Sequence, residues 1–339
     1  MKKRVFIVAE IGCNHNGNPK LAKKMVEEAK NCGVDAVKFQ TFKADLLISK
    51  IAPKAEYQKV TTGTADSQLE MTRKLELPYD EFRKLEEYAK SLGLEVFSTP
   101  FDFDSIDFLI ENKQKIWKIP SGEITNLPYL EKIARADIPN KEIVISTGMA
   151  TIEEIKWALK VLEDNGVPKD KITILHCNTE YPTPYEDVNL EAIPYLMEKF
   201  PEYKIGFSDH SQGYFDGIAS VIYGISFIEK HFTLDKNLEG PDHKASATPE
   251  ELAVLCESVR RIEVIAGGEG KRVTESEQRN INIARKSIVA RKDIKKGEVL
   301  TETNITCKRP GNGISPMKWY EVLGTKAIKD FAEDQLIEV

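Results

Sequence analysis

Eight short runs of β-branched and aromatic residues recur along the first 231 residues, and amphipathic stretches separate them. The runs are VFIVAEIG, DAVKFQ, LEVFSTP, KIWKIPSGE, EIVISTG, ITILHC, YKIGFSDH and ISFIEKHF. Helical segments follow them, beginning for example at Leu21, Glu81, Thr151 and Pro249. This alternation predicts a parallel sheet, and eight units in roughly 265 residues match a closed (β/α)8 barrel of the TIM type. An open doubly wound sheet is the structural alternative, but no G-x-G-x-x-G motif follows any run.

The last part of the chain follows a different pattern, which predicts a second, smaller domain. We expect the barrel over residues 1–268 and a linker over residues 269–286, which are polar and lack apolar periodicity. Residues 287–339 have the pattern of short β segments with turns and a closing helix near WYEVLG. A module of about 50 residues buries little surface alone, so it is expected to dock against the barrel or a partner subunit. The long stretch 41–74 after the second run is expected to be a lid or a dimer contact.

Composition excludes several classes of protein. The chain has 48 Lys and Arg against 54 Asp and Glu, and the net charge of −6 argues against general attraction to nucleic acid or a membrane. The five cysteines form no C-x-x-C pair, so neither a disulfide framework nor a structural zinc site is indicated. No run approaches the roughly 18 apolar residues of a membrane helix. We interpret the N-terminal MKKRVFIVAEIG as a first strand rather than a signal peptide, and we expect a cytoplasmic protein.

All eight predicted strands end in hydrogen-bonding or ionisable side chains, which predicts a polar pocket at the C-terminal mouth of the barrel. In chain order these are Glu10, Lys38, Gln40, Ser98, Thr99, Lys118, Ser121, Glu123, Ser146, Thr147, His176, Asn178, Ser208, His210, Glu229 and His231. Neighbours on a strand face opposite sides of the sheet. We therefore expect Cys177, beside His176, to pack away from the pocket.

Two histidines are candidates for a metal site. His210 ends the seventh predicted strand and His231 the eighth, so adjacent strands bring two imidazoles to the same mouth. They could form a partial metal site with open positions for water and substrate oxygen, or they could be two hydrogen-bonded core histidines. Asp209 and Asp242 could orient the imidazoles.

Two lysines are candidates for binding an anion. Lys38 and Lys118 lie near the ends of otherwise apolar runs, where a buried ammonium needs an anionic partner. Together with Ser121, Ser146 and Thr99 they favour a phosphate or carboxylate site, although each lysine alone could simply reach solvent. A Schiff-base role for either lysine stays open at this point.

Ten segments together resemble the bacterial N-acetylneuraminate (sialic acid) synthase family. They are IVAEIGCNHNG, DAVKFQTFKAD, FSTPFD, IWKIPSGE, ISTGMA, ILHCNTEYPTP, GFSDHS, IEKHFTLD, GPDH and KRPGNGISP, and they span Val8 to Pro316. The resemblance implies a (β/α)8 barrel followed by a small C-terminal antifreeze-like (β-clip) domain and a homodimer with swapped C-terminal domains. It also implies condensation of phosphoenolpyruvate with an N-acetylated hexosamine, N-acetylmannosamine, to give N-acetylneuraminate and phosphate. The implied cofactor is a divalent metal, usually Mn2+, with Mg2+ or Co2+ as alternatives.

The resemblance also assigns roles to residues. His210 and His231 would be the metal ligands, and Glu10, His231 and Lys38 would carry the chemistry. The residues that would hold phosphoenolpyruvate are Lys38, Thr99, Lys118, Ser121, Ser146 and Ser208. Those that would face the sugar are Gln40, Glu123, Tyr181, Asp242 and Arg309, the last reaching over from the partner subunit's small domain. Where some members have H-x-T-N-x-Y, this chain has HCNTEY, so Asn178 and Thr179 both remain candidates for the phosphate contact.

Three rival functions remain open. A synthase of the same family could take a different sugar, such as the 2,4-diacetamido-2,4,6-trideoxymannose that yields legionaminate, because one or two pocket side chains decide the choice. A Schiff-base aldolase would use Lys118 and would not depend on metal. A non-catalytic sugar-phosphate-binding barrel would bind ligand without turnover.

Overall fold

The computed structural model describes residues 4–268 and 270–339. The chain forms two compact units, Met1–Gly267 and Gly268–Val339. Met1–Lys3, which precede the first predicted strand, and residue 269 of the predicted linker lie outside the described residues. Every described helix is too short or too polar to traverse a bilayer.

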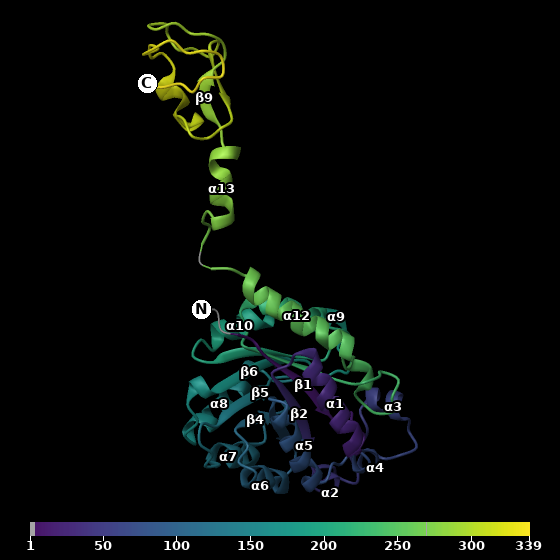
Figure 1. Ribbon diagram of the computed structural model, residues 1–339. Coiled ribbons are helices and arrows are strands. Elements are labelled where there is room, and N and C mark those ends of the chain that lie inside the picture. The colour runs from purple at the N-terminus through teal and green to yellow at the C-terminus, as the bar shows by residue number, and fades with distance from the viewer. Residues whose placement is uncertain (1–3, 269) are drawn as a thin grey trace. The chain divides into compact units, whose positions relative to one another are not determined.

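The first unit contains eight parallel strands, which confirms the predicted barrel. They are β1 (Phe6–Gly12), β2 (Ala36–Thr41), β3 (Glu95–Pro100), β4 (Ile116–Ile119), β5 (Glu142–Ser146), β6 (Ile172–Cys177), β7 (Lys204–Asp209) and β8 (Phe227–His231). Their order in the sheet is β3-β2-β1-β8-β7-β6-β5-β4, so the first strand pairs with the last. Figure 1 shows the helices packed around the outside of these strands.

Several of the longer helices of this unit begin or end at capping signals. Their bounds are α1 (Pro19–Cys32), α2 (Ala44–Leu47), α3 (Glu56–Thr62), α4 (Gln68–Arg73), α5 (Tyr79–Ser91), α6 (Phe103–Glu111), α7 (Leu127–Arg135), α8 (Ile152–Asp164), α9 (Tyr185–Val188), α10 (Ala192–Lys199), α11 (Phe215–Ser220) and α12 (Pro249–Ile265). The Asn18 side chain caps α1, which ends at Gly33 with a φ of 89°. Capping boxes begin α8 at Thr151 and α12 at Thr248.

The barrel interior changes from apolar to polar within two residues along every strand. The apolar plug consists of Val8, Ala36, Phe97, Val144, Leu175 and Phe227, with Phe6 and Ile116 packed against it. Side chains on a strand face the same side at every second residue. Two positions further along the strands stand Glu10, Lys38, Thr99, Lys118, Ser146, Cys177, Ser208 and Glu229. The apolar plug therefore lies directly beneath a layer of polar side chains at the C-terminal mouth.

One seam of the barrel is held by a side chain instead of a backbone ladder. Among the described residues, β3 and β4 are the two ends of the hydrogen-bonded strand order, although they lie side by side. The buried Gln114 amide bridges them, because its Oε1 accepts from Ser98 N at 2.7 Å and its Nε2 donates to Ser98 O at 2.9 Å. The Gln114 carbonyl in turn accepts from Trp117 Nε1 at 2.7 Å. We call this line between β3 and β4 the seam.

Removing the Gln114 amide is expected to destabilise the barrel. Gln114→Ala leaves the buried N–H and C=O of Ser98 without these partners, so the free energy of unfolding should fall by about 2–3 kcal/mol. Urea unfolding at neutral pH measures this difference. The matched control is Lys115→Ala at the exposed neighbouring position, which should change stability by less than about 0.5 kcal/mol. Equal stability of the two variants would contradict the role given to Gln114.

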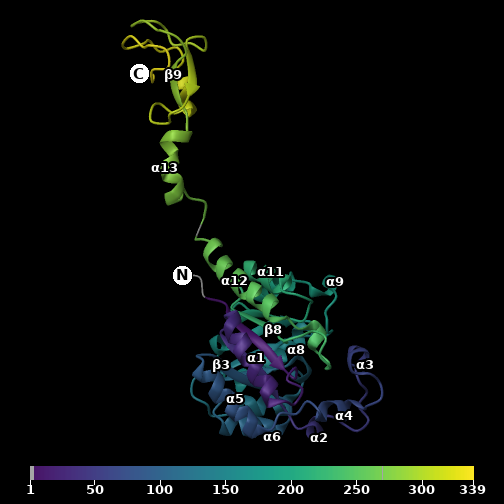
Figure 2. The same cartoon turned by 45° about the vertical axis from the view of Figure 1, so that its right-hand side comes forward.

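Residues 41–74 contain the three short helices α2, α3 and α4 rather than an irregular loop. Figures 1 and 2 both show these helices together at one side of the barrel. A capping box at Ser67 begins α4, and the rings of Tyr57 in α3 and Tyr181 lie 5.3 Å apart. This segment, which we call the lid segment, therefore contacts the residues that follow β6.

The second unit contains a small antiparallel sheet of β9 (Ser287–Ala290) and β10 (Ile305–Lys308), with α14 (Trp319–Val322) near its end. Its core consists of Ile288, Ala290, Ile294, Leu300, Ile305, Val322, Ala327, Phe331 and Ile337. The polar stretch predicted as a linker contains the helix α13 (Glu275–Ala284), which has no buried residue. Its capping box at Thr274 and Glu277 is the local signal that stabilises it in the absence of an apolar face.

His15, between β1 and α1, is expected to make stability fall in mild acid. Burial lowers its pKa from 6.5 to about 4, and its Nδ1 accepts from Gly17 N at 3.0 Å. The folded state keeps His15 neutral while the unfolded chain takes up a proton below pH 6.5, so this contribution is complete above pH 6.5 and is lost as the pH falls towards 4. At pH 5 the loss is about 2 kcal/mol. Urea unfolding of the wild type and His15→Asn at pH 7.5 and 5.0 should show a steeper loss in the wild type; parallel losses would refute it.

Candidate active site

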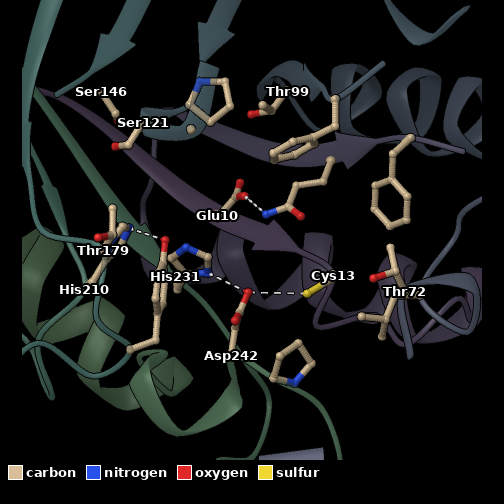
Figure 3. A pocket seen from close by; sticks show the side chains of 18 of the residues that line it. Glu10, Cys13, Thr72, Thr99, Ser121, Ser146, Thr179, His210, His231 and Asp242 are labelled. Carbon is tan, nitrogen blue, oxygen red and sulfur yellow. Dashed lines mark hydrogen bonds and ion pairs between the residues drawn. The ribbon is translucent and has the colours of Figure 1, made fainter. Parts of the chain in front are cut away.

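A cavity of about 400 Å3 opens at the C-terminal mouth of the barrel, as predicted from the strand ends. The polar residues that line it from the strand ends and the loops after them are Glu10, Lys38, Gln40, Thr99, Lys118, Ser121, Glu123, Ser146, Thr179, Tyr181, His210, Glu229, His231 and Asp242. Residues 41–74 add Tyr57, Gln58, Gln68 and Thr72. Figure 3 shows Ser121, Ser146 and Thr179 towards one end of the cavity, Cys13 and Thr72 towards the other, and Glu10 and His231 between them.

Four buried charged groups form the floor of the cavity. Lys38 Nζ lies 3.1 Å from Glu10 Oε1 and 3.5 Å from Glu229 Oε2. Lys118 Nζ lies 3.0 Å from Glu229 Oε1. Lys38 also donates to Thr99 Oγ1 at 3.0 Å. Each lysine therefore has the anionic partner that its burial requires, and both face the cavity.

The two carboxyl groups differ in their tendency to hold a proton. Burial raises the pKa of Glu10 from 4.5 to about 7, against the opposing charge of Lys38. Burial also acts on Glu229, but the charges of Lys118 and Lys38 outweigh it and lower the pKa of Glu229 to about 2. Glu229 is therefore the permanent counter-charge. Glu10 changes its protonation near neutral pH, which suits a group that exchanges protons with substrate.

The pKa values of Lys38 and Lys118 shift in opposite directions. Burial lowers the pKa of Lys118, and Glu229 offsets only part of the effect. Burial acts in the same direction on Lys38, but two carboxylates, Glu10 and Glu229, outweigh it and raise the pKa of Lys38. Lys118 is thus the lysine with the weaker counter-charge, and an anionic ligand in the cavity would supply what it lacks.

The two candidate metal-binding histidines lie side by side, with ring centroids 5.2 Å apart. His210 Nδ1 contacts the carbonyl oxygen of Asn178. That contact turns His210 Nε2 towards the cavity, 3.1 Å from the Tyr181 hydroxyl and 3.4 Å from Ser208 Oγ. His231 Nδ1 is buried without a hydrogen-bond partner in the described part of the chain. It lies 3.8 Å from Asp242 Oδ2.

This arrangement fits a divalent metal with few protein ligands. A carbonyl that fixes one imidazole nitrogen leaves the other free to ligate, and His231 offers an unpaired nitrogen. Within the residues described, no group of three or more His, Cys, Asp and Glu is arranged to hold a metal ion. A metal at His210 and His231 would therefore complete its coordination with water or substrate oxygen.

The structure corrects the expected orientation of the side chains at the end of β6. His176 faces outward, where its Nε2 contacts Val188 O at 2.8 Å. Cys177 lines the cavity, with Sγ 3.7 Å from both His210 Nδ1 and Ser121 Oγ. The sequence prediction assigned His176 and Cys177 to the wrong faces of β6. An error of one position along a strand exchanges its two faces.

Three other candidates lie away from the cavity surface. The Asn178 side chain accepts from Glu180 N at 2.8 Å and closes a turn, whereas Thr179 lines the cavity. Ser208 Oγ donates to Glu229 Oε1 at 3.1 Å, beside the floor. Asp209 pairs with the buried Lys230 at 3.0 Å and accepts from Ser211, and among the described residues no contact of it with an imidazole is found.

The other candidates named by the family resemblance differ in their surroundings. Ser146 Oγ is buried without a partner in the described part of the chain, and Ser121 Oγ accepts from Gly148 N at 3.0 Å. Gln40 Nε2 donates to Glu10 Oε1 at 3.0 Å, and Glu123 accepts from Asn126 Nδ2 at 2.6 Å. Arg309 belongs to the second unit, where its Nε donates to Ala284 O at 3.1 Å.

Sequence reasoning gave no role to several residues of the site. Glu229 was noted at a strand end, but its position between two lysines appears only in three dimensions. The signal available in the sequence is that Glu229 and His231 are two residues apart on one strand and therefore face the same side. Cys13 donates to Asp242 Oδ2 at 3.4 Å. The lid segment also contributes Tyr57, Met71 and Thr72 to the lining, for which the sequence offers no local signal.

Two family models match the chain. The model of the NeuB family matches residues 25–271, and the model of the SAF domain matches residues 285–338. The first covers most of the barrel and the second covers the sheet of the second unit.

Relatives and a solved structure match most or nearly all of the chain. The chain is 52% identical over 335 residues to the N,N'-diacetyllegionaminic acid synthase of Campylobacter jejuni, covering 99% of both chains. It is 43% identical over 323 residues to the enzyme of the same name from Legionella pneumophila, covering 95% of this chain and 90% of that one. The crystal structure of N-acetylneuraminic acid synthetase from Leptospira borgpetersenii matches with a TM-score of 0.71 and 33% identity, covering 83% of this chain and 91% of that chain. The chain therefore belongs to the NeuB family and is a synthase-type enzyme with a C-terminal SAF domain.

Proposed function

We propose that this protein condenses phosphoenolpyruvate with 2,4-diacetamido-2,4,6-trideoxymannose to give N,N'-diacetyllegionaminate and phosphate. The observation that carries the choice of sugar is the 52% identity to a diacetyllegionaminic acid synthase across 99% of both chains. The likeness to a solved N-acetylneuraminic acid synthetase is 33%. The comparisons thus favour the alternative sugar over N-acetylmannosamine, which the sequence motifs had put first.

The floor of the cavity supports the binding of phosphoenolpyruvate. A ligand with carboxylate and phosphate groups needs cations that are held in place, and Lys38 and Lys118 are both buried and both face the cavity. Ser121, Ser146 and Thr179 add hydroxyl groups at the same end. Of Thr179 and Asn178, we assign the phosphate contact to Thr179, because Thr179 lines the cavity and the Asn178 side chain accepts from Glu180 N. These residues would orient the enol carbon towards the two histidines.

Glu10 would move the proton that the reaction requires, because it lines the cavity and its pKa is about 7. Carbon 3 of phosphoenolpyruvate forms a bond to the sugar aldehyde carbon, and the positive charge that develops at carbon 2 is quenched by water. Glu10, with a pKa of about 7, would accept the proton of that water and pass it to the oxygen of the former aldehyde, which becomes a hydroxyl group. The C–O bond from carbon 2 to the phosphate then breaks, carbon 2 becomes a keto carbon, and phosphate leaves with the hydroxyl proton of the tetrahedral intermediate. Gln40 Nε2, 3.0 Å from Glu10 Oε1, would hold this carboxyl group in place.

A divalent metal, Mn2+ with Mg2+ or Co2+ as alternatives, would be held by His210 and His231. When bound there, it would polarise the aldehyde oxygen of the open-chain sugar as a Lewis acid. The residues that would face the sugar are Gln40, Glu123, Tyr181 and Asp242, which all line the cavity. A homodimer in which Arg309 of the partner subunit reaches the sugar's N-acetyl group is part of the same proposal.

Phosphate release tests the proposal directly. After chelator treatment, the protein is supplied with phosphoenolpyruvate and either sugar, with and without Mn2+. We expect metal-dependent release with both sugars and a kcat/KM at least about tenfold higher for the diacetamido sugar. Release with N-acetylmannosamine alone would return the chain to N-acetylneuraminate synthesis. Metal-independent trapping of pyruvate by borohydride would identify a Schiff-base aldolase, and binding without turnover would identify a binding barrel.

A further inference from the structure

The two ends of the cavity differ in chemistry. The end with Ser121, Ser146 and Thr179 is polar, whereas the opposite end, marked by Cys13 and Thr72 in Figure 3, adjoins the lid segment. The apolar lining residues are Phe42, Leu47, Ile48, Met71, Leu75 and Phe101. We call the end of the cavity that adjoins the lid segment, with these apolar side chains, the lid end.

The lid end is preformed rather than loosely packed. Cys13, Phe42 and Leu75 are buried in one cluster, with Leu47 and Phe101 packed against it. The rings of Phe42 and Phe101 meet edge to face with centroids 6.4 Å apart. A methyl group that enters such a cluster exchanges water for hydrocarbon contacts.

Polar groups near the lid end are mostly engaged elsewhere. The Cys13 thiol donates to Asp242, and the Thr72 hydroxyl donates to Gln68 O at 2.8 Å. The Gln58 Oε1 accepts from Ala55 N at 3.0 Å. A sugar hydroxyl group placed among the apolar side chains would therefore lose its hydrogen bonds to water and find no equivalent partner in the protein.

We propose that the lid end binds the methyl-bearing end of the sugar, and that Leu47 determines the preference for a 6-deoxy sugar over one with a 6-hydroxyl group. This inference rests on the proposed function and names the part of the cavity that would select the substrate. The aldehyde carbon would lie at His210 and His231, so the far end of the sugar chain extends away from them. An apolar pocket rejects an added hydroxyl group by at most about 10²-fold, which sets the scale of the preference.

Two neighbouring leucines of α2 provide a matched test. Leu47 lines the cavity, whereas Leu46 does not and is 55% exposed. In Leu47→Gln, the ratio of kcat/KM for the diacetamido-trideoxy sugar to that for N-acetylmannosamine should fall tenfold or more, through KM rather than kcat. Leu46→Gln should keep the wild-type ratio, and Leu47→Met, which restores an apolar side chain, should keep most of it.

A binding experiment keeps the inference separate from the reaction. The probes are N-acetylmannosamine and 2-acetamido-2,6-dideoxymannose, which differ only in the hydroxyl group on carbon 6. Calorimetry with the full-length protein should give a Kd at least fivefold lower for the 6-deoxy probe, and Leu47→Gln should abolish that difference. Equal affinities in the wild type, or an unchanged difference in a folded Leu47→Gln variant, would overturn the role of the lid end. Failure of the proposed function would appear instead as absence of phosphate release with both sugars.

Discussion

Turnover by the His231→Ala variant is expected to be at least about 10³-fold slower than that of the wild type at saturating metal. The reason is that His210 and His231 are the only two imidazoles that the described structure brings to the cavity, and one imidazole alone holds a divalent metal weakly. The expected loss is in kcat, since the floor residues that would hold phosphoenolpyruvate stay in place.

Three measurements check this expectation. Urea unfolding should show a folded protein, phosphate release should show the lost rate, and Mn2+ titration followed by electron paramagnetic resonance should show lost metal binding. His176→Asn is the matched control, because His176 faces away from the cavity and contacts Val188 O. Full metal-dependent turnover by His231→Ala would remove the metal assignment.

The Lys118→Met variant is expected to lose about 10² to 10³-fold in kcat/KM for phosphoenolpyruvate. Methionine keeps most of the volume of the side chain but removes the ammonium group, and Lys38 then remains as the single cation of the floor. Glu229, which keeps its contact with Lys38, lies 3.0 Å from Lys118 Nζ and loses one of its two cationic partners. The KM for the sugar should change far less than that for phosphoenolpyruvate.

The same variant separates the proposed reaction from Schiff-base chemistry. Lys115→Met, at an exposed position just before β4, is the control for general effects of removing a lysine. If Lys118 formed a Schiff base, borohydride in the presence of pyruvate would inactivate the wild type, whereas it would not lower the remaining activity of Lys118→Met. We expect no such inactivation. Equal losses for both substrates would show that Lys118 serves the fold rather than the anion.

The barrel was predictable because its signal is repeated and local. Each strand is a short apolar run, and several helices carry their own start signal, such as Thr151 or Thr248. The mouth residues followed from the rule that parallel strands end at one face. The prediction went wrong where a single residue decides the outcome, as at His176 and Cys177, because strand parity must be counted from a boundary that the sequence marks only within a residue or two.

Other features depend on contacts between distant parts of the chain. The helices of the lid segment are four to seven residues long and are stabilised by contacts such as that of Tyr57 with Tyr181, which no local pattern encodes. Likewise, the low pKa of Glu229 results from lysines on two other strands. Sequence alone could name such a residue at a strand end but could not give its charge state.

The seam also has a consequence for the motions of the barrel wall. A closed ladder opens only when several backbone hydrogen bonds break together, whereas β3 and β4 are joined at the seam by the two hydrogen bonds of one amide group. Local breathing that exposes backbone amides to exchange should therefore begin along this line. Lys38 and Lys118 stand on β2 and β4, on opposite sides of it. The distance between the two lysines of the cavity floor should therefore change with the same fluctuation that opens the wall.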